Sequence, residues 1–408
     1  MKKGKKVAFP GVEVGFPFDF LKEVKGLPGY ALRGLTLNVY LCFLRNSNDK
    51  RQREAAIKLH EFLRSHGLGA QKLIFGEYGA DLDQQLITQN INGIDIINPF
   101  YVGPASPDIF PEEWFGRRIP SLQASFESNS KIWLRKHCNR SVFPHYRIIR
   151  DSSDAEPVIR NVLRNSSTGK ILIKEDGGAS GSGITTFSRV DPAVWHAKDV
   201  LLKLKECNRN PEIIIEEKRI KIVDGSIRVV VPRIGEGGPY VKGLTKQYVD
   251  GEAHLGNIIT SNGRIPDFSD DVYLVWDKIK GAVDAIQRLG YWGYVTIDFF
   301  IDLSGNVWVA EVNARMTASY FLDDLCDQIS RKYPDTEFAI ASYNCTTPGV
   351  DSFDKIMRVI GDDVFDGRFG VFPNLMAFRS KTGIIVVGPD YLETENKMFQ
   401  VKNRIERS

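Results

Sequence analysis

The sequence predicts a protein of mixed α/β and α+β architecture with more than one subdomain. Three features lead to this fold class: strands and helices alternate along residues 35–97, two strands flank a glycine-rich loop at residues 170–188, and an acidic hairpin spans residues 293–312. Alternating strand, helix and strand indicate a parallel sheet, whereas strands joined by a turn indicate a hairpin. A chain of 408 residues is also too long for one ordinary core.

The composition excludes several classes of protein. Hydrophobic content of 42% and charged content of 26% are those of a soluble globular protein. A net charge of +3 gives no case for nucleic-acid binding, and no apolar run is long enough to span a membrane. The basic start is followed by a segment interrupted by prolines and acids, which makes a poor signal peptide. Five scattered cysteines without a C-x-x-C pair are typical of reduced thiols, so we expect a cytoplasmic protein.

The N-terminal part of the chain predicts a small parallel α/β unit. Residues 1–34 contain glycine and proline at short intervals and show no clear period. Ala56, Leu59 and Leu63 share one face of the first expected helix. The expected elements are a strand at 35–44, a helix at 50–66, a strand near 71–75, a helix at 77–89 and a strand near 91–97. The proline-rich segment 103–120 is expected to be a loop or linker.

The next part of the chain again alternates between helical and extended patterns. The expected elements are helices at 127–138, 154–164 and 192–206, and strands at 145–150, 170–174, 184–188 and 211–218. Further on, residues 293–302 and 307–312 are rich in aromatic and β-branched residues, with turn residues between them.

The loop Glu175–Gly183, with the sequence EDGGASGSG, separates two of these strands. Glycines allow a backbone to close over phosphates with its N–H groups pointing at them, although a plain mobile loop would have the same composition. No helix follows the loop, so the glycine pattern does not indicate a Rossmann fold, and the P-loop motif is absent. Lys174 ends the strand that enters the loop and could reach a nucleotide phosphate; the alternative is an exposed lysine of an edge strand.

Acidic residues follow apolar strands at two further places. Glu216 and Glu217 follow three isoleucines, where a strand end could face an adenine or could simply be solvated. Glu311 and Asn313 are two residues apart and therefore share one face of a strand, with Asp298 in the preceding strand and Arg315 just beyond. Two carboxylates and an amide suit Mg²⁺, whereas the alternative is a surface hairpin that carries a salt bridge.

The E-x-N-x-R sequence from Glu311 to Arg315, with the acid Asp298 upstream, resembles the metal-binding hairpin of the ATP-grasp superfamily of carboxylate–amine ligases. The other parts occur in the order that this family shows: a lysine at a helix start, the glycine-rich hairpin, the I-I-I-E-E strand and a strand with Arg228. The resemblance covers residues 127–320. The family often has Glu where this chain has Asp298, and Asp keeps the same chemistry.

The resemblance implies ATP as cofactor with Mg²⁺, which Mn²⁺ could replace, and it assigns a role to each matching residue. The implied nucleotide-binding residues are Lys131, Lys174, the lid residues Asp176, Gly178, Ser180, Gly181, Ser182 and Gly183, and the adenine or ribose edge Glu216, Glu217, Lys218 and Arg219. The implied metal ligands are Asp298, Glu311 and Asn313. The implied catalytic residues are Lys174, Arg315 at the transferred phosphate, and Arg228 as a clamp for the substrate carboxylate or acyl phosphate.

The resemblance also implies a domain order. We expect a pre-ATP-grasp α/β domain at 1–125, an N-terminal ATP-grasp subdomain with the lid at 126–220, a C-terminal subdomain with the metal site at 221–345, and a small α+β segment at 346–408. Within the last segment, residues 370–398 predict strand, turn, strand and a short helix. This order is similar to that of peptide ligases of the pheganomycin type.

The implied function is ATP-dependent ligation of a carboxylate to an amine through an acyl phosphate, giving an amide or peptide bond in peptide or natural-product biosynthesis. The implied partners are small-molecule or peptide carboxylates and amines, without nucleic acid or membrane, and a homodimer is compatible with them. Two alternatives stay open: a small-molecule kinase of the same fold, and a nucleotide-binding regulator without catalysis.

Overall fold

The computed structural model describes most of the chain from residue 119 onward and parts of the chain before it. The described ranges are 7–9, 41–44, 50–75, 96–97, 119–176, 183–207, 210–251, 253–268, 271–315, 317–347, 352–377 and 381–408, with a few isolated residues besides. The predicted helix at 77–89 and most of the proline-rich segment lie outside these ranges. No helix in the described ranges is long and apolar enough to cross a membrane.

The N-terminal residues form a parallel sheet, as predicted. Its strands are β1 (Val7–Phe9), β2 (Leu41–Leu44), β3 (Lys72–Phe75) and β4 (Ile96–Ile97), in the order β3-β2-β1-β4. Helix α3 (Lys50–Ser65) connects β2 to β3 and buries Ala56, Leu59 and Leu63, which confirms the predicted face. Strand β1 was not predicted, because its three residues lie among glycines and prolines that obscure any period.

A second, antiparallel sheet follows with its own helices. The elements are α5 (Leu122–Ser128), α6 (Lys131–His137), η4 (Arg140–Val142), β5 (Tyr146–Ile149), η5 (Ser152–Asp154), α7 (Ala155–Asn165), β6 (Ile171–Glu175), β7 (Ile184–Phe187), α8 (Val190–Glu206) and β8 (Ile213–Glu217). The strand order is β5-β8-β6-β7. Helices α7 and α8 share a separate core with this sheet, to which Ile159, Leu201 and Ile215 belong. The predicted strands and the helices at 154–164 and 192–206 are therefore confirmed.

The helix predicted at 127–138 is present only in part, because a break after Ser128 separates α5 from α6, which covers Lys131–His137. Asn129 is the C-cap of α5, and Ser130 is the N-cap of α6, where its hydroxyl accepts a hydrogen bond from the Trp133 backbone N–H at 2.9 Å. A side-chain oxygen at this position satisfies an N–H group that has no partner within the helix. The break places Lys131 in the first turn of α6.

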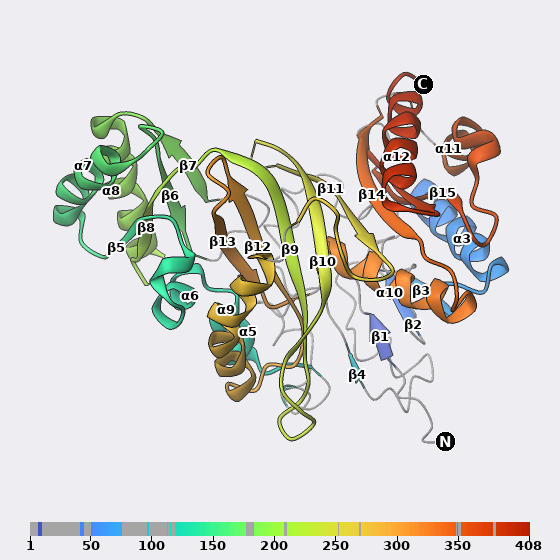
Figure 1. Ribbon diagram of the computed structural model, residues 1–408, viewed down its shortest axis with the longest axis horizontal. Helices are drawn as coiled ribbons and strands as arrows, with labels where there is room; N and C mark the ends of the chain where they lie inside the picture. Colours follow the sequence, from blue (N-terminus) through green and yellow to red (C-terminus); the bar gives the residue numbers. More distant parts are fainter. Residues whose placement is uncertain are drawn as a thin grey trace.

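The largest sheet has eight strands and extends into the C-terminal segment (Figure 1). Its strands are β9 (Lys221–Val231), β10 (Tyr240–Asp250), β11 (Ala253–Thr260), β12 (Gly293–Asp302), β13 (Val307–Asn313), β14 (Ala339–Thr346), β15 (Gly370–Ala377) and β16 (Lys381–Gly388). All neighbours pair antiparallel in the order β13-β12-β9-β10-β11-β14-β16-β15. The helices are α9 (Asp271–Arg288), α10 (Ala318–Lys332), α11 (Phe353–Ile360), η6 (Gly361–Asp363) and α12 (Tyr391–Glu406). The predicted short C-terminal helix is wrong in length, since α12 has 16 residues.

The two faces of this sheet differ in character. Ile227, Leu244 and Ile297 lie on one face, in a core shared with α9 and α12. Asp298, one residue from Ile297, points to the opposite face because side chains alternate along a strand. Part of that opposite face is apolar and packs against α10 and α3. The rest of it carries the candidate site.

Candidate active site

Asp298, Glu311 and Asn313 come together at the paired ends of β12 and β13. Asp298 is the cross-strand partner of Glu311, and Thr296 is the partner of Asn313. The Asn313 Nδ2 donates to Asp298 Oδ2 at 2.7 Å and to Glu311 Oε1 at 3.1 Å. Oxygens of both carboxylates therefore lie within 3.1 Å of one atom. The hairpin brings together the three side chains that the sequence singled out.

Two cations adjoin this acid pair. The Lys131 Nζ lies 3.2 Å from Glu311 Oε2, and the Lys131 side chain is only 5% exposed. Arg315 donates to Asn129 Oδ1 at 3.0 Å, and Asn129 donates in turn to the Ala314 carbonyl at 3.1 Å. The helix break at Asn129 and Ser130 thus places Lys131 and Arg315 beside the hairpin.

The two carboxylates have pKa values that move apart. Burial and the neighbouring Glu311 carboxylate raise the pKa of Asp298 to about 8. Burial alone would raise the pKa of Glu311 too, but Lys131 and Arg315 lower it below its ordinary value. Glu311 is therefore the member of the pair that ionises more readily.

This set of side chains fits a magnesium ion that takes only a few ligands from the protein and the others from nucleotide phosphates and water. In the described part of the chain, no group of three or more His, Cys, Asp and Glu side chains could hold a metal ion by itself. Mg²⁺ in nucleotide sites commonly takes one or two protein carboxylates and completes its shell with phosphate oxygens and water. Asp298 and Glu311 supply that incomplete set, and Asn313, whose NH₂ group here faces both carboxylates, would join it by turning its amide oxygen toward the ion.

Lys174 lies in a buried cluster of charges near the start of the lid. Its Nζ bonds to Glu216, and Glu216 also bonds to Arg135 of α6. Burial lowers the pKa of Lys174. Burial would raise the pKa of Glu216, but the neighbouring Lys174 and Arg135 outweigh it, so that the pKa of the Glu216 carboxyl is lowered. Glu216 therefore stays ionised and faces two cations.

The described ends of the lid are anchored to neighbouring elements. The Asp176 carboxylate accepts from Ser130 Oγ at 2.6 Å and from the Ile132 backbone N–H at 3.4 Å, at the start of α6. The Gly183 carbonyl accepts from the Glu175 N–H at 2.8 Å, and Gly183 has a φ of +73°, which favours glycine. The predicted lid residues Gly178, Ser180, Gly181 and Ser182 lie outside the described residues.

The predicted adenine edge divides into separate contacts. The Glu217 carboxylate accepts from the Ser167 N–H and hydroxyl at 3.1 Å and from Arg219 at 3.0 Å. The Lys218 Nζ donates to Thr186 Oγ1 at 3.2 Å. Glu216 and Glu217 point to opposite faces of β8. Which of the two would face an adenine or ribose therefore depends on the face of this strand that a nucleotide occupies.

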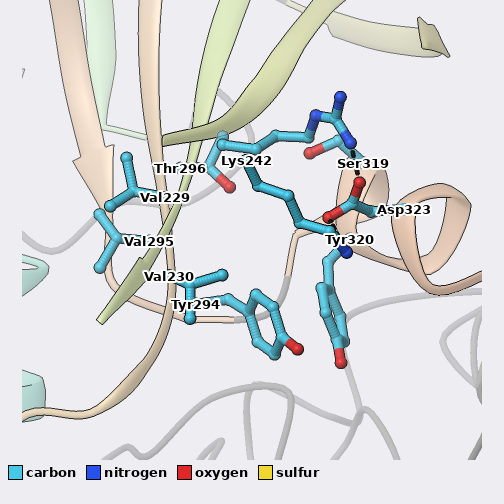
Figure 2. A pocket seen from close by; sticks show the side chains of 10 residues that line it. Val229, Val230, Lys242, Tyr294, Val295, Thr296, Ser319, Tyr320 and Asp323 are labelled. Carbon is cyan, nitrogen blue, oxygen red and sulfur yellow. Dashed lines mark hydrogen bonds and ion pairs between the residues drawn. The ribbon is translucent and has the colours of Figure 1, made fainter. Parts of the chain in front are cut away.

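Arg228 lies on the same face of the sheet as Asp298 but has partners within the protein. It bonds to Asp323 of α10 and donates to the Leu244 carbonyl at 3.0 Å. Asp323 also lies 2.9 Å from Lys242 Nζ. In Figure 2, Asp323, Tyr294 and Tyr320 line a small pocket beside this ion pair, and the two tyrosine rings lie 3.7 Å apart. The structure therefore ties Arg228 to α10, whereas the sequence predicted a clamp for substrate.

Sequence reasoning missed three side chains that contact the site. Asn129 holds Arg315, Arg135 bonds to Glu216, and Gln247 donates to Asp298 Oδ1 at 3.0 Å. Arg135 follows Lys131 by one helical turn, and this spacing is the only signal in the sequence that could have indicated it. Gln247 reaches Asp298 across β9, and only the pairing of the strands brings these two residues together.

Comparisons with known proteins bear on the fold of the chain. No protein-family profile matches the chain. A phosphoribosylamine–glycine ligase from Archaeoglobus fulgidus is 26% identical over 156 residues, which are 34% of this chain and 32% of that protein. The chain thus spans about a third of the length of this curated relative.

Solved structures match nearly the whole chain at low sequence identity. Biotin carboxylase from Campylobacter jejuni, solved as a β-γ-ATP complex, has a TM-score of 0.61 and 11% identity, over 99% of this chain and 94% of that one. N5-carboxyaminoimidazole synthetase from Staphylococcus aureus, solved with ADP, has a TM-score of 0.55 and 14% identity, over 98% of both chains. These likenesses show that the chain has the ATP-grasp fold, as the sequence predicted. None of these proteins is a peptide ligase of the pheganomycin type.

Proposed function

We propose that this protein is an ATP-dependent carboxylate–amine ligase that forms an amide or peptide bond and releases ADP and phosphate. The observation that carries the proposal is the meeting of Asp298, Glu311 and Asn313 with Lys131 and Arg315 at one end of the β12–β13 hairpin. Two acids for a metal and two cations for phosphates are what phosphoryl transfer from ATP requires.

The proposed reaction has two steps. A carboxylate oxygen of the first substrate attacks the γ-phosphorus of ATP, the bond to the β-phosphate oxygen breaks, and ADP leaves as an acyl phosphate forms. The amine of the second substrate then attacks the acyl carbon, phosphate leaves, and the nitrogen loses a proton. Mg²⁺ held by Asp298, Glu311 and Asn313 would supply charge neutralisation at the phosphates.

The chain's own residues have roles in both steps. Lys131 and Arg315 both lie beside the acid pair and would balance the charge that spreads over phosphate oxygens. Glu216 bonds to Lys174 and so holds its side chain in place near the end of β6, just before the lid begins. The glycine-rich lid would exclude water, which otherwise hydrolyses an acyl phosphate.

Some parts of the proposal are supported by the similar proteins, and others only by the sequence resemblance. The ligases among the similar proteins support carbon–nitrogen bond formation, and nucleotides in their structures support ATP with Mg²⁺. The roles of Lys218, Arg219, Glu217 and the lid residues rest on the sequence resemblance. A role in peptide or natural-product biosynthesis rests on the likeness to pheganomycin-type ligases. A homodimer and a cytoplasmic location stay predictions.

The test is phosphate release from MgATP by the pure protein, measured against a panel of amino acids and short peptides. We expect release only when a carboxylate and an amine are present together. Glu311→Ala and Arg315→Ala should each lower the rate by at least about a hundredfold, because each removes a group that acts on transition-state charge. Glu156→Ala, which removes an exposed carboxylate of α7, is the matched control and should keep the wild-type rate.

Each alternative gives a different result. Phosphate transfer to a substrate without any need for an amine would indicate a kinase. MgATP affinity that is unchanged in Glu311→Ala would contradict the metal site itself.

A further inference from the structure

A row of neutral polar side chains continues from Asp298 across the sheet. Ser226 of β9 is the cross-strand partner of Asp298, and Thr245 of β10 is the partner of Ser226. Gln247 lies two residues beyond Thr245 and is the partner of Asn257 on β11. Cross-strand partners point to the same face, so the row lies on the face that carries the acid pair. The hydrogen bond from Gln247 to Asp298 agrees with this placement.

Three atoms of this row have no hydrogen-bond partner among the residues that the structure describes. Ser226 Oγ, Thr245 Oγ1 and Asn257 Nδ2 are all buried without one, and their residues are 0%, 0% and 1% exposed. A buried polar group without a partner destabilises the folded protein. Asn257 is also fixed in orientation, because His254 Nε2 donates to its Oδ1 at 3.1 Å and leaves the NH₂ group to point elsewhere. Three such atoms on neighbouring strands, next to the acid pair, indicate groups kept for a ligand.

The charges around the row limit what the ligand can be. Lys246 follows Thr245 but points to the other face, where Asp267, Tyr391 and Glu395 bind it. Arg228 is on the same face as the row, but Asp323 holds it. The row itself is neutral and adjoins two carboxylates. Lys131 and Arg315 adjoin the acid pair, but among the described residues no lysine or arginine bonds to the three unpaired atoms, and Asp224 is a further acidic neighbour as a cross-strand partner of Gln247. A neutral polar group therefore suits the row better than a buried anion, whose burial is energetically costly.

We propose that Ser226, Thr245 and Asn257 form a subsite for an amide group of a substrate, and that this substrate carries no phosphate there. This inference rests on the proposed ligase function and names part of its substrate. The Asn257 NH₂ can only donate, which suits an amide carbonyl, and the two hydroxyls can accept from an amide N–H. Gln247 joins the subsite to Asp298 and would be displaced or turned when the substrate enters.

The first test measures thermal stability without any ligand. Thr245→Val keeps the shape of the side chain and removes an unpaired hydroxyl, so it should raise Tm by about 1 to 3 °C. Thr382→Val is the matched control, because Thr382 is 1% exposed in the same sheet and its hydroxyl is paired with Thr347 at 3.2 Å. This control should lower Tm. If Thr245→Val also lowers Tm, a buried water or another partner satisfies the hydroxyl, and the inference is overturned.

The second test measures binding of a neutral amide. With MgADP present, N-acetylglycinamide should stabilise the wild type and Thr382→Val in a saturable way, and should bind Thr245→Val and Asn257→Leu at least about tenfold more weakly. Ribose 5-phosphate should give no shift. Three results would each overturn the subsite. The amide could raise Tm equally in all variants, or it could leave the Tm of the wild type unchanged. Ribose 5-phosphate could also raise Tm in a saturable way. None of these readings needs phosphate release, so the subsite and the ligase proposal can fail separately.

Discussion

At the scale of single residues, Glu216 is the most constrained acid that the sequence singled out. Its carboxylate is buried between Lys174 and Arg135, whose guanidinium also lies 4.8 Å from the centre of the Phe143 ring. Burial by itself would favour the neutral acid, but the two cations keep the pKa of Glu216 low. The same carboxylate offsets the burial of Lys174, so the three residues depend on one another.

Arg135→Met should therefore lower the free energy of unfolding by about 3 kcal/mol, because it leaves Glu216 buried with one cation instead of two. Urea unfolding followed by circular dichroism measures this. Arg160→Met is the control, since Arg160 pairs with Glu156 on the exposed face of α7 at 2.7 Å, and its loss should cost less than about 0.5 kcal/mol. Equal effects of the two substitutions would mean that Glu216 is solvated in solution.

What the sequence predicted at this scale depends on how far each residue lies from a motif. Lys131, Lys174 and Glu311 are each next to a recognisable feature: a helix start, a glycine-rich loop and an E-x-N-x-R sequence. Arg135 and Gln247 are not, because their partners come from other strands or helices. Arg228 also has a partner that the sequence does not indicate, since Asp323 lies 95 residues away, and its role as a clamp stays a prediction.

At the scale of elements, the β12–β13 hairpin depends on its turn. Asp302 accepts hydrogen bonds from the backbone N–H groups of Ser304 and Asn306 and from the Trp308 ring N–H, at 2.8 to 3.0 Å. Gly305 has a φ of +79°, as this turn requires. Burial opposes ionisation of Asp302, but these bonds outweigh it and lower its pKa. The turn thus sets the pairing of Ile301 with Val307, and a β-bulge at Asp298 and Phe299 then shifts the register so that Asp298 lies opposite Glu311.

A pH dependence follows from the Asp302 carboxylate. Its pKa is lower in the folded than in the unfolded protein, so its contribution to stability is complete above the ordinary value of 3.8 and is lost as pH falls through the folded pKa. Asp302→Asn should be less stable than the wild type by about 1 to 2 kcal/mol at pH 6. This difference should shrink as pH falls toward 3 and below, and denaturant titrations at both pH values measure it. A difference that stays constant or grows in acid would contradict the role of the charge.

The hairpin was predictable from the sequence because alternating apolar residues and a Ser-Gly-Asn turn are local signals. The break between α5 and α6 was not predicted, because the apolar residues on both sides continue one helical pattern. The side chain of Ser130 caps the N-terminus of α6, and this cap marks where the second helix begins. Strand β1, with three residues, is too short for any periodic signal.

At the scale of the whole molecule, the large sheet joins the candidate site to the C-terminal segment. One core contains Ile297 and Phe299, which flank Asp298, and also Met398 and Val401 of α12. Helix α12 packs on β14 and β16, at the far end of the sheet from β12. Figure 1 shows α12 at the right beside β14, and the β12–β13 hairpin near the middle, with β9, β10 and β11 between them. A shared core predicts that these regions unfold together.

Met398→Ala should test this, because Met398 is fully buried while Leu392 on the same helix is 65% exposed. Loss of the buried side chain should cost about 2 to 5 kcal/mol, and Leu392→Ala should cost less than about 0.5 kcal/mol. Hydrogen exchange then shows how far the loss extends. In Met398→Ala, amides of β12 should exchange faster by nearly the same factor as those of β16, since both open through the same global unfolding. Faster exchange confined to β16 and α12 would mean that the C-terminal segment unfolds by itself, and that the site does not depend on it.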